Sequence, residues 1–260
     1  MHQDVIALRR FYYNRALGRV AQRILRDRLC AAWPPAQTAG MTVAGFGFAV
    51  PMLRPWLGQA RRVTGLMPEG QGVMPWPAGL PNHAVLCSET AWPLETGSVD
   101  RLVLLHALET SDAPAGLLAE AWRVLGPGGR MVVMVPNRAG LWARADSTPF
   151  GVGRSYSRHQ LEAQVEGAGF VTEKSDGAVY IPPSDRRFWL RTALWWERLG
   201  WRISAMLIAG VVMAEFSKQV SAPIGPARRV SVKSSLEALG GIARPAREGA
   251  SPAHQPRRQD

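Results

Sequence analysis

The sequence has few of the residues that bind metals or form disulfides. It contains two cysteines, Cys30 and Cys87, and five histidines scattered along the chain. Zinc sites need Cys and His at short spacings, and disulfide-stabilised folds need more cysteines. We therefore expect no metal centre, and we expect Cys87 to be a reduced thiol within an apolar strand. The sequence also lacks the G-x-S-x-G elbow of serine hydrolases and the phosphate-binding loop of nucleotide triphosphatases.

Long hydrophobic runs are absent as well. The longest one, residues 203–214, is too short to span a bilayer and fits a buried strand better. Charged residues are scattered through the N-terminal region, which is therefore unlike a signal peptide. With 47% hydrophobic and 20% charged residues, the composition is typical of a globular protein. These features predict a cytoplasmic protein.

The positive charge is concentrated near the two ends of the sequence. The formal net charge is +11; residues 1–30 hold seven arginines against two aspartates, and residues 221–260 hold seven Lys and Arg against three acids. The middle of the chain is close to neutral, which argues against a basic groove for nucleic acid. Residues 221–260 are rich in Pro, Gly, Ser, Ala and Arg without aromatics, and we expect this tail to be disordered.

Periodicity divides the rest of the chain into alternating helices and strands. Residues 4–29 form one predicted amphipathic helix, with Ile6, Tyr13, Leu17, Val20 and Ile24 on its apolar side. Helices are further predicted at 51–60, 115–124, 156–168 and 186–201, and strands at 41–48, 62–67, 83–87, 102–105, 131–135, 170–181 and 209–220. Residues 68–82 contain too many prolines and glycines for a helix and predict an irregular loop. This order predicts a doubly wound α/β domain with a mostly parallel seven-stranded sheet and an antiparallel last strand.

Two blocks of sequence are the most specific signals. The first, Trp92 to Asp100, reads WPLETGSVD and leads into a buried strand; the second, Arg123 to Gly129, reads RVLGPGG and joins a helix to the next strand. In order and wording they resemble the class I S-adenosylmethionine-dependent methyltransferases, of the methyltransferase type 11-like branch. The resemblance implies a Rossmann-like domain over residues 36–220 with a helical insertion at 184–202, preceded by a helix and linker at 1–35. It also implies S-adenosylmethionine as the cofactor.

The resemblance places the cofactor beside the turn that follows the first strand. This turn, Gly45-Phe46-Gly47-Phe48-Ala49, has a G-x-G-x-A spacing similar to the family's, although a tight turn without a ligand would read the same way. The family's acids have no counterpart at the aligned positions, which hold Val43, Met67 and Ser88. Glu69 or Glu89 would then have to substitute for them. The cofactor-binding residues implied by the resemblance are Gly45, Phe46, Gly47, Ala49, Met67, Ser88, Glu89 and His106.

Methyl transfer requires a general base only when the acceptor must lose a proton. His106 is the candidate catalytic residue because it follows the fourth strand, where α/β sheets bind their ligands. Glu109 follows three residues later and either orients His106 or opens the next helix. Asn137 is a similar candidate after the fifth strand, and we expect His159 to be structural, near a helix start with Ser155 or Ser157 as the cap.

Arginines and aromatic residues gather in the insertion. Arg187, Arg191, Arg198 and Arg202 share one side of the predicted helix, among Phe188, Trp189, Trp195, Trp196 and Trp201. Such a helix suits a membrane surface, a roof over the active site, or the core with a solvated arginine stripe. The N-terminal helix is open to the same alternatives, including a lid over the active site.

Two functions remain open from the sequence. The first is methyl transfer, by in-line displacement, to a small-molecule or lipid-like acceptor. The second is a catalytically inactive methyltransferase-like module for binding or regulation, in which Phe46, Phe48 and Met67 would close the pocket.

Overall fold

A computed structural model describes residues 3–202 and 208–219, apart from the side chain at position 201. Over these residues the chain forms a seven-stranded sheet of order β3-β2-β1-β4-β5-β7-β6. Only β7 runs antiparallel to its neighbours, which confirms the predicted fold class. The strands are β1 (Thr42–Gly47), β2 (Arg62–Pro68), β3 (Ala84–Cys87), β4 (Val99–Leu105), β5 (Leu125–Pro136), β6 (Val171–Ala178) and β7 (Val211–Ser217).

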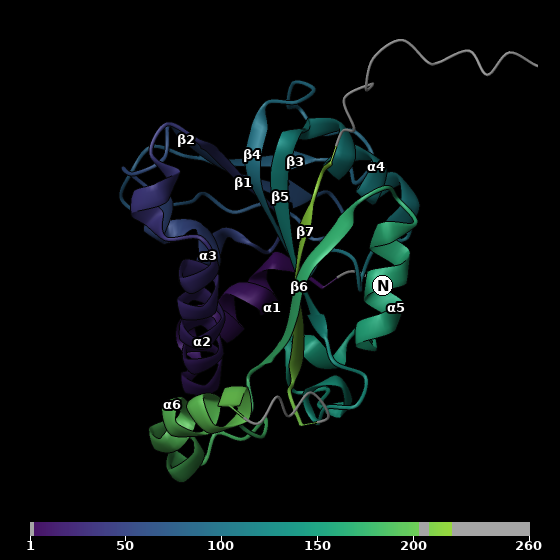
Figure 1. Cartoon of the computed structure of the whole chain (residues 1–260). Helices are drawn as coiled ribbons and strands as arrows, with labels where there is room; N and C mark the ends of the chain where they lie inside the picture. The colour runs from purple at the N-terminus through teal and green to yellow at the C-terminus, as the bar shows by residue number, and fades with distance from the viewer. Residues whose placement is uncertain (1–2, 203–207, 220–260) are drawn as a thin grey trace, which may run out of the picture. The chain divides into compact units, whose positions relative to one another are not determined.

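Helices cover both faces of the sheet (Figure 1). One face carries α1 (Val5–Arg9), α2 (Ala16–Ala32), α3 (Val50–Leu53) and α6 (Arg187–Arg202), and the other carries α4 (Pro114–Val124) and α5 (Arg158–Glu166). Each face has its own apolar core, so strand residues alternate between the two. Val103 and Leu105 of β4 belong to the first core, whereas Leu102 and Leu104 belong to the second.

The prediction of a single helix over residues 4–29 is wrong. The segment divides into α1, the π-helical turn η1 (Arg10–Asn14) and α2, because Arg15 is extended, with φ −86° and ψ 139°. Ile6 was placed on the apolar side but is 70% exposed. The break lets residues before and after Arg15 contact different parts of the domain, which one straight helix would not allow.

The helix after β1 is also shorter than predicted. It was expected to continue to residue 60, but α3 ends at Leu53 and a 3-10 turn follows at Arg54–Trp56. Pro55 has no backbone N–H to donate to an earlier turn, so the regular α-helix stops before it. The predicted loop over residues 68–82 is confirmed, and the predicted tail, residues 221–260, lies outside the described residues.

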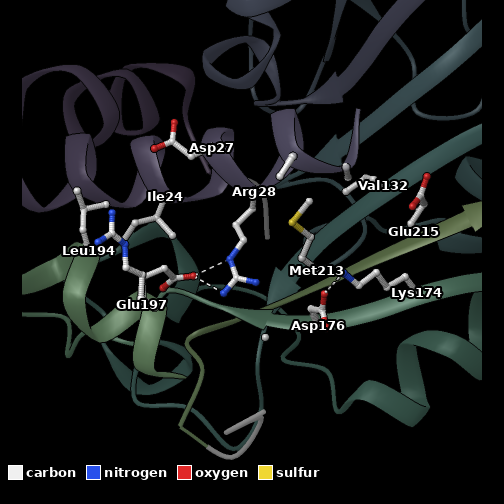
Figure 2. Close-up of a pocket in the computed structure, with 14 residues that line it drawn as sticks. Ile24, Asp27, Arg28, Val132, Lys174, Asp176, Leu194, Glu197, Met213 and Glu215 are labelled. Carbon is white, nitrogen blue, oxygen red and sulfur yellow. Dashed lines mark hydrogen bonds and ion pairs between the residues drawn. The ribbon is translucent and has the colours of Figure 1, made fainter. Parts of the chain in front are cut away.

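A cavity of about 800 Å³ lies where α2 and α6 cover the β5–β7–β6 side of the sheet. Figure 2 shows apolar side chains that line it, among them Ile24 of α2, Val132 of β5 and Met213 of β7, together with one ion pair. Arg28 of α2 and Glu197 of α6 form that ion pair, with 2.7 Å between Nη2 and Oε1. No residue among those predicted to bind the cofactor lines this cavity.

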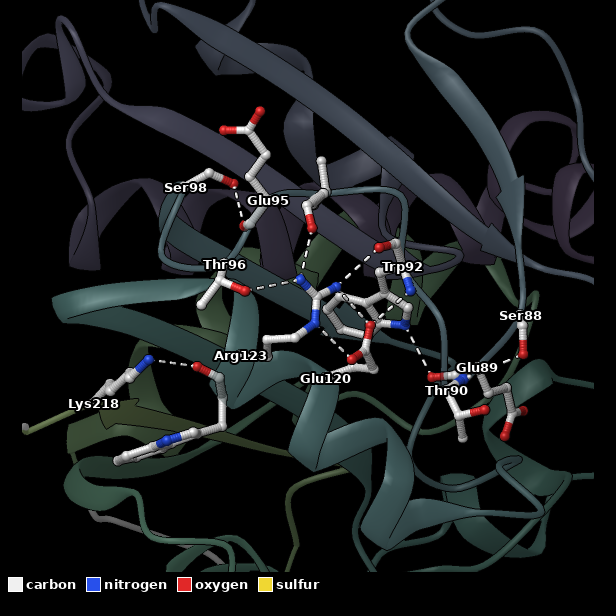
Figure 3. Close-up of polar contacts among 12 residues, drawn as sticks. Ser88, Glu89, Thr90, Trp92, Glu95, Thr96, Ser98, Glu120, Arg123 and Lys218 are labelled. Carbon is white, nitrogen blue, oxygen red and sulfur yellow. Dashed lines mark hydrogen bonds and ion pairs between the residues drawn. The ribbon is translucent and has the colours of Figure 1, made fainter.

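The two signature blocks of the sequence are joined to each other by one guanidinium group (Figure 3). Arg123 donates hydrogen bonds to the backbone oxygens of Trp92 and Leu94, at 2.9 and 2.8 Å, and to the carboxylate of Glu120. Glu120 in turn accepts the backbone N–H of Trp92 at 2.7 Å. The bond from Arg123 holds the pKa of the Glu120 carboxyl below its usual value. These contacts connect the two blocks in the folded protein.

Candidate functional site

The predicted site lies at the carboxyl ends of β1 and β4. The strand order reverses between these two parallel neighbours, and α/β sheets bind ligands in the crevice that such a reversal creates. Gly47 at the end of β1 pairs with Leu105 at the end of β4, so the glycine-rich turn and His106 are brought together as predicted.

The two glycines of the turn are required by packing within the protein itself. A Cβ on Gly47 would lie 2.3 Å from the backbone oxygen of Leu105, and its φ of +82° also favours glycine. A Cβ on Gly45 would lie 2.7 Å from that of Ala49, at the start of α3. Both positions therefore allow β1, β4 and α3 to approach closely, which is sufficient to explain them without a ligand.

His106 is fully buried and makes two side-chain hydrogen bonds. Its Nδ1 lies 3.1 Å from Oε1 of Glu109, and its Nε2 lies 2.7 Å from the hydroxyl of Tyr12 in η1. Glu109 also accepts the backbone N–H of Ala107 through Oε2 at 3.2 Å. His106 has a φ of +50°, a left-handed conformation that a side chain adopts at a cost of about 1–3 kcal/mol.

The two contacts of His106 fit one tautomer of its ring. A carboxylate only accepts hydrogen bonds, so Nδ1 of His106 carries the proton that Glu109 accepts. Burial raises the pKa of the Tyr12 phenol well above its usual value, with a further contribution from Glu109, so this hydroxyl remains a donor. In the tautomer with the proton on Nδ1, Nε2 of His106 accepts from the Tyr12 hydroxyl, and it is the nitrogen that faces the N-terminal segment. Orientation of an imidazole by a carboxylate is the arrangement that a general base requires.

The N-terminal segment, residues 3–14, covers the crevice. Val5 donates its backbone N–H to the backbone oxygen of Gln71 at 2.8 Å, and the ring of Tyr12 stacks on Phe48 at 5.7 Å between centroids. The side chain of Gln71 reaches from the loop after β2 to the backbone oxygen of His106 after β4. Gln3 bonds to the backbone oxygen of Pro149 at 2.6 Å. Protein side chains thus occupy the space across β2, β1 and β4.

The resemblance would place an acid that holds the cofactor ribose at Met67, and an acid near the adenine at Ser88. The Met67 side chain is 1% exposed and accepts the backbone N–H of Met74 on its sulfur at 3.4 Å. On the adenine side, Glu89 accepts the Ser111 hydroxyl at 2.8 Å, and Ser88 lies beside it (Figure 3). Phe46 points to the opposite face of the sheet and stacks on Trp92, with ring centroids 4.5 Å apart.

As arranged here, the residues do not fit S-adenosylmethionine. No carboxylate lies at the position of Val43 or Met67, and the N-terminal segment and Gln71 fill the crevice. One observation points the other way: Oε1 of Gln71 is buried without a hydrogen-bond partner among the described residues. Such an acceptor, on the loop that follows Met67, suits a hydroxyl group that enters from outside.

Two further candidates have structural roles. Asn137 is buried and donates to the backbone oxygen of Ala209 at 2.7 Å, which ties the end of β5 to the start of β7. His159 is 95% exposed on α5, where Ser157 caps the helix with Gln160 in a capping box. The prediction missed Tyr12 and Gln71, because nothing in their spacing indicates that both would meet His106.

Comparison with known proteins agrees with this fold. Residues 44–133 match the family model described as "Methyltransferase domain". A second match, 43% identical over 67 residues, is to an uncharacterised 37.1 kDa protein in a transposon of Streptomyces fradiae; it spans 26% of this chain and 19% of that protein.

Solved structures with a similar fold include methyltransferases. One is from Thermotoga maritima, described as a possible histamine N-methyltransferase, with a TM-score of 0.56 at 17% identity over 83% of this chain and 96% of that one. Another, from Mesorhizobium loti, has a TM-score of 0.50 at 15% identity over 74% and 96%. Geranyl diphosphate methyltransferase, in complex with geranyl diphosphate and sinefungin, has a TM-score of 0.50 at 15% identity over 75% and 76%. The chain therefore contains a segment that matches a methyltransferase domain, and it shares the fold of S-adenosylmethionine-dependent methyltransferases.

Proposed function

We propose that this protein is a cytoplasmic enzyme that methylates a small or lipid-like acceptor through an ionisable N–H or O–H group. The observation that carries this proposal is the buried pair of His106 and Glu109 at the carboxyl end of β4. A base that is already oriented by a carboxylate is of use only if a proton is removed. An acceptor that is nucleophilic without losing a proton would not need it.

Each residue has a distinct part in this proposal. His106 accepts the acceptor's proton at Nε2, the atom now bonded to the Tyr12 hydroxyl. Glu109 is a positioning residue, since the only ring atom of His106 that it contacts is Nδ1, while its other oxygen accepts the backbone N–H of Ala107. The cofactor of the family supplies an electrophilic methyl group on a sulfonium. Tyr12 holds its hydroxyl where the acceptor's own hydroxyl or amine would lie, so it occupies the acceptor position while the crevice is closed.

Catalysis in this proposal requires the N-terminal segment to move. The break at Arg15 separates residues 3–14 from α2, so the segment is able to swing while α2 stays packed on the sheet. Removing Tyr12 and Val5 from the crevice would free Nε2 of His106 and expose Gln71. The described arrangement is then the closed state of the site.

The deciding experiment is calorimetric titration of the full chain with S-adenosylmethionine and with S-adenosylhomocysteine, paired with thermal melts. A ligand at 100 times its dissociation constant stabilises by about 2.7 kcal/mol, which a melt detects. Micromolar binding supports the proposal, and release of S-adenosylhomocysteine during incubation with candidate amines, phenols and lipid extracts then identifies the acceptor. Absence of binding at millimolar cofactor refutes it.

A second function is favoured by one observation. Phe48 and Met67 are both buried in the same core as Tyr12, as expected for a methyltransferase-like module that has lost its cofactor and serves in binding or regulation. The prediction that Phe46 also closes the pocket is wrong, because Phe46 packs in the core on the other face of the sheet. The same titration separates the two functions, since the module is expected to bind no cofactor.

A further inference from the structure

The exposed face of α6 combines aromatic residues with arginines. Phe188 is 61% exposed and Trp195 is 59% exposed, and Leu199 continues the same strip one turn further on. These positions are spaced by seven and four residues, so they lie on one side of the helix. Single exposed apolar residues are ordinary on protein surfaces, but a strip that includes two large aromatic rings needs a partner.

Positive charge runs along the edge of this strip. Arg187, Arg191, Arg198 and Arg202 are all exposed. The one acid of the helix, Glu197, points the other way, is 8% exposed and pairs with Arg28 of α2. The exposed face of α6 therefore presents cations without anions from its own helix.

The opposite side of α6 is fixed to the domain, so the exposed strip is not a displaced core face. Ala193 is buried, and a Cβ on Gly200 would lie 2.3 Å from the ring of Tyr180. Glu197 also accepts the backbone N–H of Tyr180 at 3.2 Å. Rotation of the helix to bury Phe188 and Trp195 would break these contacts.

The helix begins at the same end of the sheet as His106, past the carboxyl ends of the parallel strands. β6 runs parallel to β5, and α6 follows β6, so α6 begins past the carboxyl ends of the parallel strands (Figure 1). Ile208, which precedes β7 at that end, is 60% exposed. None of the helices among the described residues is long and apolar enough to cross a bilayer.

We propose that the exposed face of α6 binds the surface of an anionic lipid membrane. Arginines would contact lipid phosphates while Phe188, Trp195 and Leu199 enter the boundary between headgroups and acyl chains. An acidic protein partner would pair with the arginines equally well. A membrane surface also accounts for the row of apolar side chains along the helix, which an acidic partner would not require. The membrane contact does not depend on the proposed function. If that function holds, the contact presents lipid-embedded acceptors at the edge that contains His106.

The test is co-sedimentation of the full chain with two kinds of vesicle. One is phosphatidylcholine alone, and the other contains about 30% phosphatidylglycerol, which gives the surface a negative potential. We expect binding to the anionic vesicles at 0.1 M salt and its loss at 0.5 M salt, roughly the range over which screening lengths become short. No cofactor is added, so failure here and failure of cofactor binding are separate results.

Two variants test the residues. Removing one arginine near the surface weakens binding about fivefold, so Arg191→Gln with Arg198→Gln should weaken it about 30-fold. Trp195→Ser should weaken it on the order of tenfold through lost apolar burial. The matched control is Arg62→Gln with Arg158→Gln, which removes the same charge from exposed positions on β2 and α5. Because all these side chains are exposed, melting temperatures should stay within a few degrees of the parent.

Three results would overturn the proposal. The first is the absence of binding to anionic vesicles. The second is binding that both α6 variants retain, which would assign the contact to another part of the chain. The third is equal weakening by the control pair, which would mean that only net charge matters. Saturable binding to an acidic protein, with no binding to vesicles, would assign the face to a protein partner instead.

Discussion

Replacing Tyr12 by Phe should open the cofactor crevice. The substitution keeps the ring that stacks on Phe48 and removes only the hydroxyl, which lies 2.7 Å from Nε2 of His106. In the closed state this nitrogen then becomes a buried acceptor without a partner, at a cost of about 1–3 kcal/mol. In the open state water satisfies it, so the equilibrium shifts toward the open form by that amount.

The shift has a measurable consequence for the ligand. When the closed form predominates, apparent affinity is reduced by the fraction of molecules that are open. A change of about 1–3 kcal/mol therefore predicts an S-adenosylhomocysteine dissociation constant about 5- to 150-fold lower in Tyr12→Phe than in the parent protein. The melting temperature without ligand should fall at the same time, because the closed form loses a buried hydrogen bond.

Calorimetry on the variant and the parent, each at several temperatures, measures this directly. Tyr13→Phe is the matched control, since Tyr13 is the adjacent residue in η1, is only partly buried and has no contact with His106. The reasoning is refuted if Tyr12→Phe lowers the melting temperature yet leaves the dissociation constant unchanged or raises it. Tighter binding in both variants would also refute it, because loosening η1 in general would then suffice.

The remaining predictions concern the base, the turn and the scaffold. His106→Gln should lower the rate of methyl transfer at saturating cofactor about 10²- to 10⁴-fold, and a rate independent of this residue would exclude it as the base. Gly47→Ala should destabilise the fold by several kcal/mol, about 3 or more, in chemical denaturation, whereas Gly40→Ala, with a similar φ of +78° but open space around it, should cost about 1 kcal/mol. Arg123→Met should cost about 2–4 kcal/mol, because two backbone oxygens and Glu120 lose their partner; Arg123→Lys should recover part of it. The pKa of Glu120 is lowered in the folded state, so its contribution to stability is complete above the unfolded carboxyl pKa of about 4.3. That contribution is lost as the pH falls through the folded pKa. Arg123→Met should therefore lose less stability in acid than the parent protein.

Much of the fold is determined by local patterns along the chain. Apolar runs such as Leu102–Leu105 form strands because both faces of a parallel sheet are buried, and the glycines after Arg123 mark the entry to β5. Helix-breaking residues between 68 and 82 excluded a helix there. The boundaries were less predictable where a single residue decides them, as Pro55 does for α3.

The state of the site was decided by tertiary structure alone. The glycine turn, Met67 and His106 were placed near one another by strand order, which the sequence determines through its alternating elements. The sequence pattern did not determine which side chains fill the space between them, because Tyr12 is 94 residues from His106 and reaches it only through the break at Arg15. Hydrogen bonds between distant residues depend on how helices pack, and no local pattern encodes that packing. The same holds for α6, whose arginines and aromatics were evident in the sequence, while contacts of Gly200 and Glu197 decided which side faces outward.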